Sequence, residues 1–403
     1  MIDEIIYSLK SLNQRKTRSF LTMLSVVIGV MAVFTLLSFG LGIQNYIDSI
    51  AEEAGVDKFM IQARGMGAPG TDTTFQITQQ ELEHVNRIRD VAEISGVYMT
   101  PAQIEFQGET DFQFLVGIDT RKSKFIEDTF TIKLERGREL RHDDISRVVL
   151  GYNYQFENRV FGRAINIGDR ITVNGNRYDV IGFYSEIGNP PDDATIYMSY
   201  RGYENLFPEQ KDLFSMAIGR AQTNADVDAV ADEVSERLRR YKGEEEGRET
   251  FYVMTFEEAL QTFGTIITVI NGILVIIALI SVFVASVNIM NTMYTAVLER
   301  TQEIGIMKAV GAPNNAILFI FVFESAFLGL VGGIIGIVLG YYIASTGGAI
   351  AAMAGYSLLK PIFPMYLIVG CLLFSTLIGM FAGILPARNA SMQNPVDALK
   401  ANE

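Results

Sequence analysis

Long apolar runs and polar sequence occupy separate parts of this chain. A helix needs about 20 apolar residues to cross the hydrocarbon core of a bilayer. Four stretches meet this length, and Glu324 is the one charged side chain they contain: residues 20–43, 263–297, 315–342 and 362–385. We therefore expect four transmembrane helices. The first should remain as an anchor, because its apolar run is longer than that of an ordinary signal peptide.

The insert between the first two spans, residues 44–262, has a mixed pattern. Alternation of apolar and polar residues predicts strands at residues 103–107, 112–118, 170–173, 177–181 and 214–220. Asn174-Gly175 is a strong hairpin signal between two of these strands. Residues 225–241 have apolar positions at helical spacing, and the polar residues 242–249 predict a loop. The insert is therefore expected to be a large α+β domain.

Charge divides the chain in the same way. Residues 44–262 carry 24 Lys and Arg against 39 Asp and Glu, a net charge of −15, whereas the remainder carries 9 against 7, a net charge of +2. An acidic insert argues against nucleic acid as a partner. The single Cys371 excludes an internal disulfide, and His84 and His142 lack metal-ligand spacing. We expect no metal, cofactor-binding or catalytic site on this chain.

Basic residues predict the orientation in the membrane, because they are enriched in short cytoplasmic segments. Eight of them flank the spans on the side of both termini: Lys10, Arg15, Lys16, Arg18, Arg300, Lys308, Arg388 and Lys400. The loop on the other side, residues 343–361, has only Lys360. Both termini are expected to be cytoplasmic and the insert extracytoplasmic, in a plasma or inner membrane whose lipid surrounds the spans.

The expected organisation follows the chain. It comprises a cytoplasmic amphipathic segment (1–19), span one (20–43), the extracytoplasmic domain with stalk helices (44–262), span two (263–297), a cytoplasmic helix (298–314), span three (315–342), an extracytoplasmic loop (343–361), span four (362–385) and a cytoplasmic tail (386–403). The stalks are predicted because apolar residues continue at helical spacing past the first span and before the second. They are either ordinary juxtamembrane helices or rigid connections from the domain to the cytoplasmic side.

The cytoplasmic segment between the second and third spans predicts a short amphipathic helix. Gly311 and Pro313 supply its end. One face of it has Arg300, Ile304, Lys308 and Gly311, with Glu299, Glu303 and Val310 roughly opposite. Such a helix either binds a cytoplasmic partner or is a solvated connection.

Several ordered motifs resemble one family of membrane proteins. Residues 299–312, ERTQEIGIMKAVGA, are similar to the hallmark segment of the permeases related to the macrolide exporter MacB, the lipoprotein-releasing permeases LolC and LolE and the cell-division permease FtsX. Further matches are residues 8–22, 323–325, 386–388 and 394–400, and, in the insert, residues 137–138, 148–151, 168–169 and 178–182. The set resembles a MacB-like periplasmic core domain joined to an FtsX-like permease domain.

The resemblance implies a subunit of an ATP-binding cassette (ABC) complex. In that family the helix between spans two and three couples to the ATPase, a role that the resemblance gives to Glu299, Arg300, Glu303, Gly305, Lys308 and Gly311. MacB has its ATPase on the same chain, but this sequence lacks the G-x-x-x-x-G-K-[ST] motif that cradles nucleotide phosphates. ATP and Mg are therefore expected on a separate cytoplasmic ATPase in two copies, with a second permease copy or a paralogue completing a dimer.

Two features inside the spans predict contacts between helices. A charge in lipid is costly, so Glu324 should pair with a basic residue near the cytoplasmic boundary, Arg18 or Arg388 being the candidates. Small residues allow close approach of membrane helices, and we expect this of Gly29, Gly329, Gly333, Gly336 and Gly340.

The expected function is transmission of ATP-driven motion to the extracytoplasmic domain, which expels peptides, lipoproteins or amphiphilic drugs. Substrate would not be conducted through the bilayer, because Glu324 is the single charge in the spans. The alternative is an FtsX-like scaffold that regulates an extracellular cell-wall enzyme.

Overall fold

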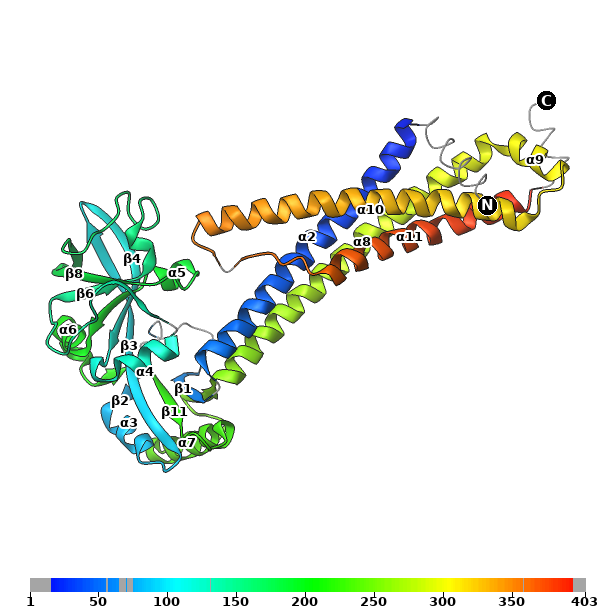
Figure 1. The fold of residues 1–403 in the computed structure, drawn as a ribbon. Helices are drawn as coiled ribbons and strands as arrows, with labels where there is room; N and C mark the ends of the chain where they lie inside the picture. Colours follow the sequence, from blue (N-terminus) through cyan, green and yellow to red (C-terminus); the bar gives the residue numbers. More distant parts are fainter. Residues whose placement is uncertain are drawn as a thin grey trace. The chain divides into compact units, whose positions relative to one another are not determined.

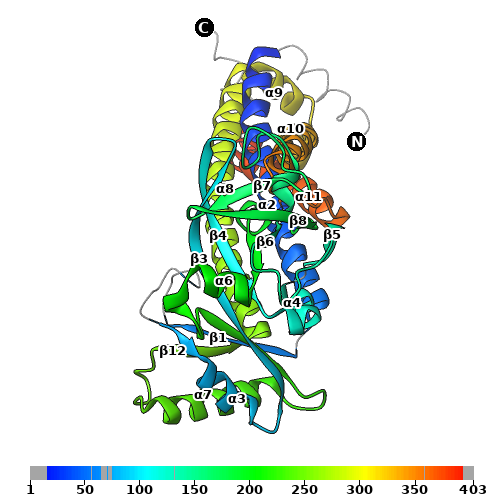
Figure 2. The same cartoon turned by 90° about the vertical axis from the view of Figure 1, so that its left-hand side faces the viewer.

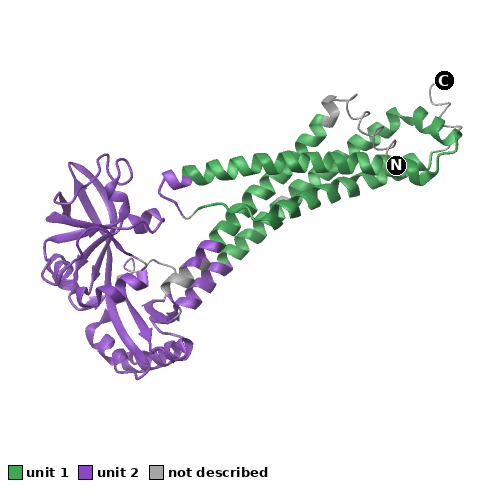
Figure 3. Cartoon of the chain, viewed as in Figure 1, with its two compact units in different colours: residues 1–44, 266–350, 359–403 green, residues 45–265, 351–358 purple. Residues whose placement is uncertain are grey.

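The computed structural model describes residues 16–55, 57–64, 70, 75–130, 132–357 and 359–393. Most of the predicted segment 1–19 and residues 394–400 of the C-terminal motif lie outside this range, as does the side chain of Arg18. The chain forms two compact units (Figure 3). Unit 1 comprises residues 1–44, 266–350 and 359–403, and unit 2 comprises residues 45–265 and 351–358.

Unit 1 is a helical bundle (Figure 1). Within the described residues, four helices are long and apolar enough to cross a membrane. With the short helix between the second and third, they are α2 (Lys16–Ala54), α8 (Phe256–Glu299), α9 (Thr301–Ala309), α10 (Asn314–Met353) and α11 (Met365–Ser391). Both α2 and α8 begin or end inside unit 2, and α10 continues into the segment predicted as a loop.

Helices α2 and α8 lie side by side and antiparallel in unit 1. Thr22 Oγ1 lies 2.6 Å from Thr292 Oγ1. Further along, a Cβ added to Gly40 would meet the side chain of Asn271. Apolar side chains from α2, α8, α10 and α11 form one buried cluster that includes Phe34, Ile289 and Phe321.

Unit 2 is built on a ten-stranded sheet. Its strands are β1 (Lys58–Ala63), β3 (Val91–Phe106), β4 (Glu109–Ile118), β5 (Leu134–Gly137), β6 (Arg147–Leu150), β7 (Arg170–Val173), β8 (Asn176–Tyr184), β9 (Ile196–Ser199), β11 (Met216–Ala221) and β12 (Phe251–Thr255). Their order is β12-β1-β11-β3-β4-β9-β6-β8-β5, and β7 pairs with β3 and β8. A small second sheet pairs β2 (Ile77–Thr78) with β10 (Leu213–Phe214).

Helices cover both faces of the sheet. They are α3 (Gln79–Asn86), α4 (Ser123–Phe130), α5 (Pro190–Asp193), α6 (Tyr200–Leu206) and α7 (Val227–Lys242). Helices α3 and α7 lie at the β1–β12 end (Figure 2) and share one core with alternate residues of β3, such as Tyr98. Phe125 of α4 joins a second core with Val97, the neighbour of Tyr98 that points to the opposite face. The α+β prediction for this unit is confirmed.

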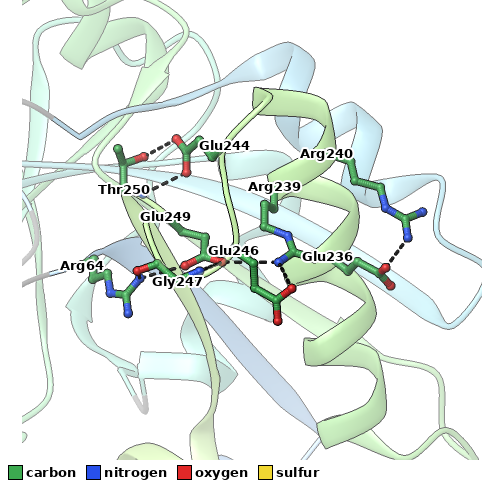
Figure 4. A network of polar contacts seen from close by, with 9 residues as sticks. All are labelled: Arg64, Glu236, Arg239, Arg240, Glu244, Glu246, Gly247, Glu249 and Thr250. Atoms are coloured by element: carbon green, nitrogen blue, oxygen red, sulfur yellow. Dashed lines mark hydrogen bonds and ion pairs between the residues drawn. The ribbon is translucent and has the colours of Figure 1, made fainter.

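The loop between α7 and β12 is held by polar contacts rather than by apolar packing (Figure 4). Arg64 Nη1 lies 2.8 Å from Glu249 Oε2, and Arg239 Nη1 lies 3.1 Å from Glu246 Oε2. Glu244 accepts hydrogen bonds from the backbone and the hydroxyl of Thr250. The charged sequence that predicted a loop thus also supplies the contacts that hold it.

Candidate functional site: the helix between the second and third spans

The chain turns at Arg300, between the end of α8 at Glu299 and the start of α9 at Thr301. The backbone of Arg300 has φ −107° and ψ 14°, outside the helical range, and no side-chain bond caps α9 at this residue. The hydroxyl of Thr301 instead donates to the carbonyl oxygens of Val297 and Leu298 across the turn, and other side chains reach the bundle. We call residues 299–311 the coupling segment, after the role that the resemblance implies for it.

One face of the coupling segment is buried in unit 1. Arg300 is 6% exposed and Ile304 is fully buried, and Gly305 is buried beside it. Lys308 Nζ donates a hydrogen bond of 2.8 Å to the carbonyl oxygen of Gln393, beyond the end of α11. These residues attach α9 to the bundle along its length.

Gly311 ends the helix as the sequence predicts. Its φ of +96° is left-handed, a conformation that glycine adopts without a steric penalty. The amide of Gly311 donates to the carbonyl of Lys308, and the amide of Ala312 donates to that of Met307, each at 3.0 Å. This pair of bonds is a Schellman motif, which satisfies the last carbonyls and turns the chain toward α10.

The opposite face of the segment is exposed. Ile306 is 51% exposed and Val310, one helical turn further, is 85% exposed. Glu299 and Glu303 are exposed as well. Two apolar side chains one turn apart, with acidic groups beside them, form a narrow ridge that a protein partner can cover.

Glu324 contacts a basic residue that the sequence-based prediction did not include. Its Oε2 accepts a hydrogen bond of 3.1 Å from Nη1 of Arg300, with the two side chains only 5% and 7% exposed. Of the two predicted candidates, Arg388 is exposed and the side chain of Arg18 lies outside the described residues. The sequence could not show this pair, because Glu324 lies 24 residues beyond Arg300 and the chain between them includes turns whose directions no local pattern gives.

Helices α10 and α11 contact each other through their backbones. A Cβ on Gly329 would overlap the carbonyl oxygen of Ser375 and lie 3.2 Å from Cα of Gly379. A Cβ on Gly333 would overlap the hydroxyl of Ser375, and one on Gly383 would overlap that of Ser325. Each helix therefore carries the same motif, S-x3-G-x3-G, and the two motifs pack antiparallel about the point where Gly329 meets Gly379.

A second glycine face of α10 packs on α2. A Cβ on Gly336 would lie 2.9 Å from the carbonyl oxygen of Val27, and one on Gly340 would lie 3.0 Å from the ring of Phe34. Gly29 of α2 makes a looser contact, 3.9 Å, with the backbone of Ser281 on α8. Close packing thus joins α10 to both α2 and α11.

The helices that enter unit 2 connect to two neighbouring strands. Strand β12 ends at Thr255, and α8 begins at the next residue. Thr255 and Glu258 exchange two hydrogen bonds between side chain and amide, at 3.0 and 3.1 Å, which is a capping box. Helix α2 leads into β1 through Gly55, whose φ is +76°. Because β1 pairs with β12, with Phe59 opposite Thr255, the two helices are tied at adjacent strand ends.

Two contacts that the sequence-based prediction missed nevertheless have signals in the sequence. The T-x-x-E pattern of Thr255 and Glu258 is the usual signature of a helix start. The S-x3-G-x3-G of residues 325–333 recurs at residues 375–383, whereas the prediction of close packing included only the glycines of the first copy. The exposure of Ile306 has no such signal.

Comparisons with known proteins agree with this architecture. Residues 19–237 match the MacB-like periplasmic core domain, and residues 260–395 match the FtsX-like permease C-terminal domain. A protein named as an uncharacterized ABC transporter permease from Methanocaldococcus jannaschii is 33% identical over 99% of this chain and 98% of its own length. The macrolide export ATP-binding/permease protein MacB of Campylobacter fetus is 28% identical over 98% of this chain but only 60% of its own length.

One solved structure matches part of this chain at low identity. The periplasmic region of MacB from Actinobacillus actinomycetemcomitans has a TM-score of 0.43 and 16% identity, covering 54% of this chain and 97% of that one. With four apolar helices and a periplasmic-type domain, the chain is a multi-pass membrane protein with an extracytoplasmic domain. The predicted resemblance is confirmed: the chain belongs to the ABC transporter permeases that combine a MacB-like periplasmic core domain with an FtsX-like permease domain.

Proposed function

We propose that this chain couples ATP hydrolysis on a separate ABC ATPase to movement of its extracytoplasmic domain. The observation that supports this most directly is the coupling segment. Its inner face is attached to the bundle through Arg300, Ile304 and Lys308, whereas Ile306 and Val310 are exposed. A segment attached on one side and exposed on the other can transfer the motion of a bound partner to the helices behind it.

The ATPase binds ATP and Mg and contacts the exposed ridge. Glu299 and Glu303 beside the ridge favour a partner surface with basic groups around an apolar groove. Two ATPase copies act on a permease dimer, formed with a second copy or a paralogue. The coupling roles of Gly305 and Gly311 are structural: Gly305 is a small residue on the buried face of α9, and Gly311 ends the helix.

Motion then reaches the extracytoplasmic domain through α2 and α8. Each is one continuous helix from the bundle into unit 2, and α8 begins directly after β12 at the capping box of Thr255 and Glu258. Movement of the domain expels a substrate taken from the outer side of the membrane. Peptides, lipoproteins and amphiphilic drugs are the substrate classes that suit such a mechanism.

Docking of the ATPase tests the proposal. The full chain is reconstituted in proteoliposomes with a candidate ABC ATPase from the same organism, a separate chain recognised by its Walker A and signature motifs. Ile306→Asp and Val310→Asp should each weaken ATPase binding by about tenfold or more, since loss of about 1.4 kcal/mol of apolar contact suffices for that. Phe112→Asp, at a residue 69% exposed in unit 2, is the matched control and should bind normally.

Binding that is unaffected by both ridge variants would contradict the proposal. The substrate class is tested in the same vesicles by screening peptides, lipopeptides and amphiphilic drugs for stimulation of ATP hydrolysis. Stimulation by an extracellular cell-wall hydrolase, and by none of these compounds, would assign the chain to the FtsX-like scaffold role instead.

A further inference from the structure

The resemblance to known permeases gives Arg300 a role in coupling, but its side chain does not face a partner. Arg300 is 6% exposed, and its guanidinium lies against Glu324 in the interior of unit 1. A side chain in this position cannot make a contact with a docked ATPase. Its function has to be sought within the bundle.

Arg300 occupies the joint between α8 and α9. The residue before it ends one helix and the residue after it begins the next, and the hydroxyl of Thr301 donates to the carbonyl oxygens of Val297 and Leu298 in the last turn of α8. These bonds bridge α8 and α9 locally and do not reach the third span. The ion pair to Glu324 holds this joint against the third span, α10.

Burial makes this contact directional and specific. A guanidinium and a carboxylate taken out of water attract strongly, and each is costly to leave without the other. The joint therefore cannot move away from α10 without separating two buried charges. The hydrogen bond from Lys308 to Gln393 attaches α9 to a different place, the end of α11. The Arg300–Glu324 pair is therefore a separate attachment, at the joint itself.

Helix α10 is the element best placed to carry this motion further. One of its glycine faces packs on α11 through Gly329 and Gly333, and another packs on α2 through Gly336 and Gly340. On the α11 side the glycines meet backbone atoms and a serine hydroxyl, and on the α2 side they pack against the backbone of Val27 and the ring of Phe34. By contrast, much of the apolar surface of α8 is exposed, as at Ile273 and Phe283.

We propose that Arg300 and Glu324 are positioning residues that fasten the coupling joint to the third span, so that α9 and α10 move as one body. ATPase motion then enters the bundle through α10 and its partners α2 and α11, in addition to the direct continuation from α9 into α8. This inference rests on the proposed function, and it adds a route for the motion and a role for two residues that do not touch the ATPase.

The first test separates docking from coupling. Arg300→Gln and Glu324→Gln are reconstituted with the ABC ATPase, and both ATPase binding and permease-dependent stimulation of hydrolysis are measured. Binding should stay within about twofold of the unmodified chain, while stimulation should fall by about tenfold, within the usual range of coupling between sites. The charge-reversed double variant, Arg300→Glu with Glu324→Arg, should recover part of the stimulation. Arg388→Gln, which removes an exposed arginine, is the matched control and should behave as the unmodified chain.

The second test does not depend on the stability of these variants. Spin labels at the exposed residues Ala309 and Asn315 report the distance between α9 and α10 in the otherwise unmodified chain. This distance should not change when the bound ATPase is switched from ADP to a non-hydrolysable ATP analogue. A change in it, or full stimulation in Arg300→Gln, would overturn the inference. Failure of the unmodified chain to bind the ATPase would instead overturn the proposed function.

Discussion

Replacing Gly329 with alanine tests how closely α10 and α11 pack. The added methyl group would overlap the carbonyl oxygen of Ser375 and lie 3.2 Å from Cα of Gly379. Both neighbours are backbone atoms, so no side-chain rotation relieves the overlap. The α11 backbone would have to retreat by roughly 1 Å, and overpacking of this kind typically costs about 1–3 kcal/mol.

A gain in helix propensity offsets part of that cost. Alanine is better than glycine inside a helix by about 0.5–1 kcal/mol. The net expectation for Gly329→Ala is a loss of about 1–2 kcal/mol in the free energy of unfolding. Gly370 of α11 has no atom within 4 Å of an added Cβ, so Gly370→Ala should be neutral or slightly stabilising.

The assay is unfolding of the full chain in mixed micelles by titration with a denaturing detergent, followed by loss of helical circular dichroism. The two variants make the same chemical change in the same bundle and differ in whether the methyl group has room. If Gly329→Ala proved as stable as Gly370→Ala, the helices could separate at little cost, and the backbone contact would not hold α10 and α11 together.

Three further predictions concern a buried carboxylate, the start of α8 and the end of α9. Burial opposes ionisation of Asp144, but hydrogen bonds from Arg138 and Arg147 outweigh the burial and lower the pKa of Asp144 below the ordinary value. The ionised carboxylate therefore stabilises the fold above about pH 4, and this stabilisation is lost as the pH falls further. Asp144→Asn should therefore cost about 1–3 kcal/mol at pH 7 and progressively less below pH 4 in thermal unfolding of the full chain. Thr255→Ala removes the cap of α8 and should cost about 1 kcal/mol, seen as faster hydrogen exchange in the first turn of α8. Gly311→Val places a branched side chain at φ +96° and should lower ATPase stimulation, while the thermal unfolding of unit 2 stays unchanged. Stimulation equal to that of the unmodified chain would show that the end of α9 is not constrained.

Local patterns predicted the local structure of this chain well. Asn174-Gly175 forms the expected tight turn, with φ of 45° and 80°, because the type I′ hairpin needs positive φ at both positions. The helical periodicity of residues 225–241 became α7, Val227–Lys242. In both cases the residues that give the signal are the same residues that form the turn or helix, so the local sequence is enough to predict it.

Contacts between distant segments were not predictable in the same way. Strand β4 lies parallel to β9 and β6 lies parallel to β8, pairings that depend on how the whole sheet is assembled. The glycines of α10 predicted close packing but not its direction, and they divide between two neighbours. Arg300 was assigned by motif, and only the turn before α9 brings it to Glu324.

The pairing of β1 with β12 restricts how the ends of α2 and α8 within unit 2 can move. Strand β12 leads directly into α8, and Gly55 follows the end of α2 three residues before β1 begins. Five residue pairs, from Phe59 opposite Thr255 to Ala63 opposite Phe251, set the register of the two strands. Sliding one strand past the other would break the hydrogen bonds of this ladder, whereas turning both strands together leaves them intact. The ladder therefore resists a piston stroke between these strands and permits a swivel of the pair.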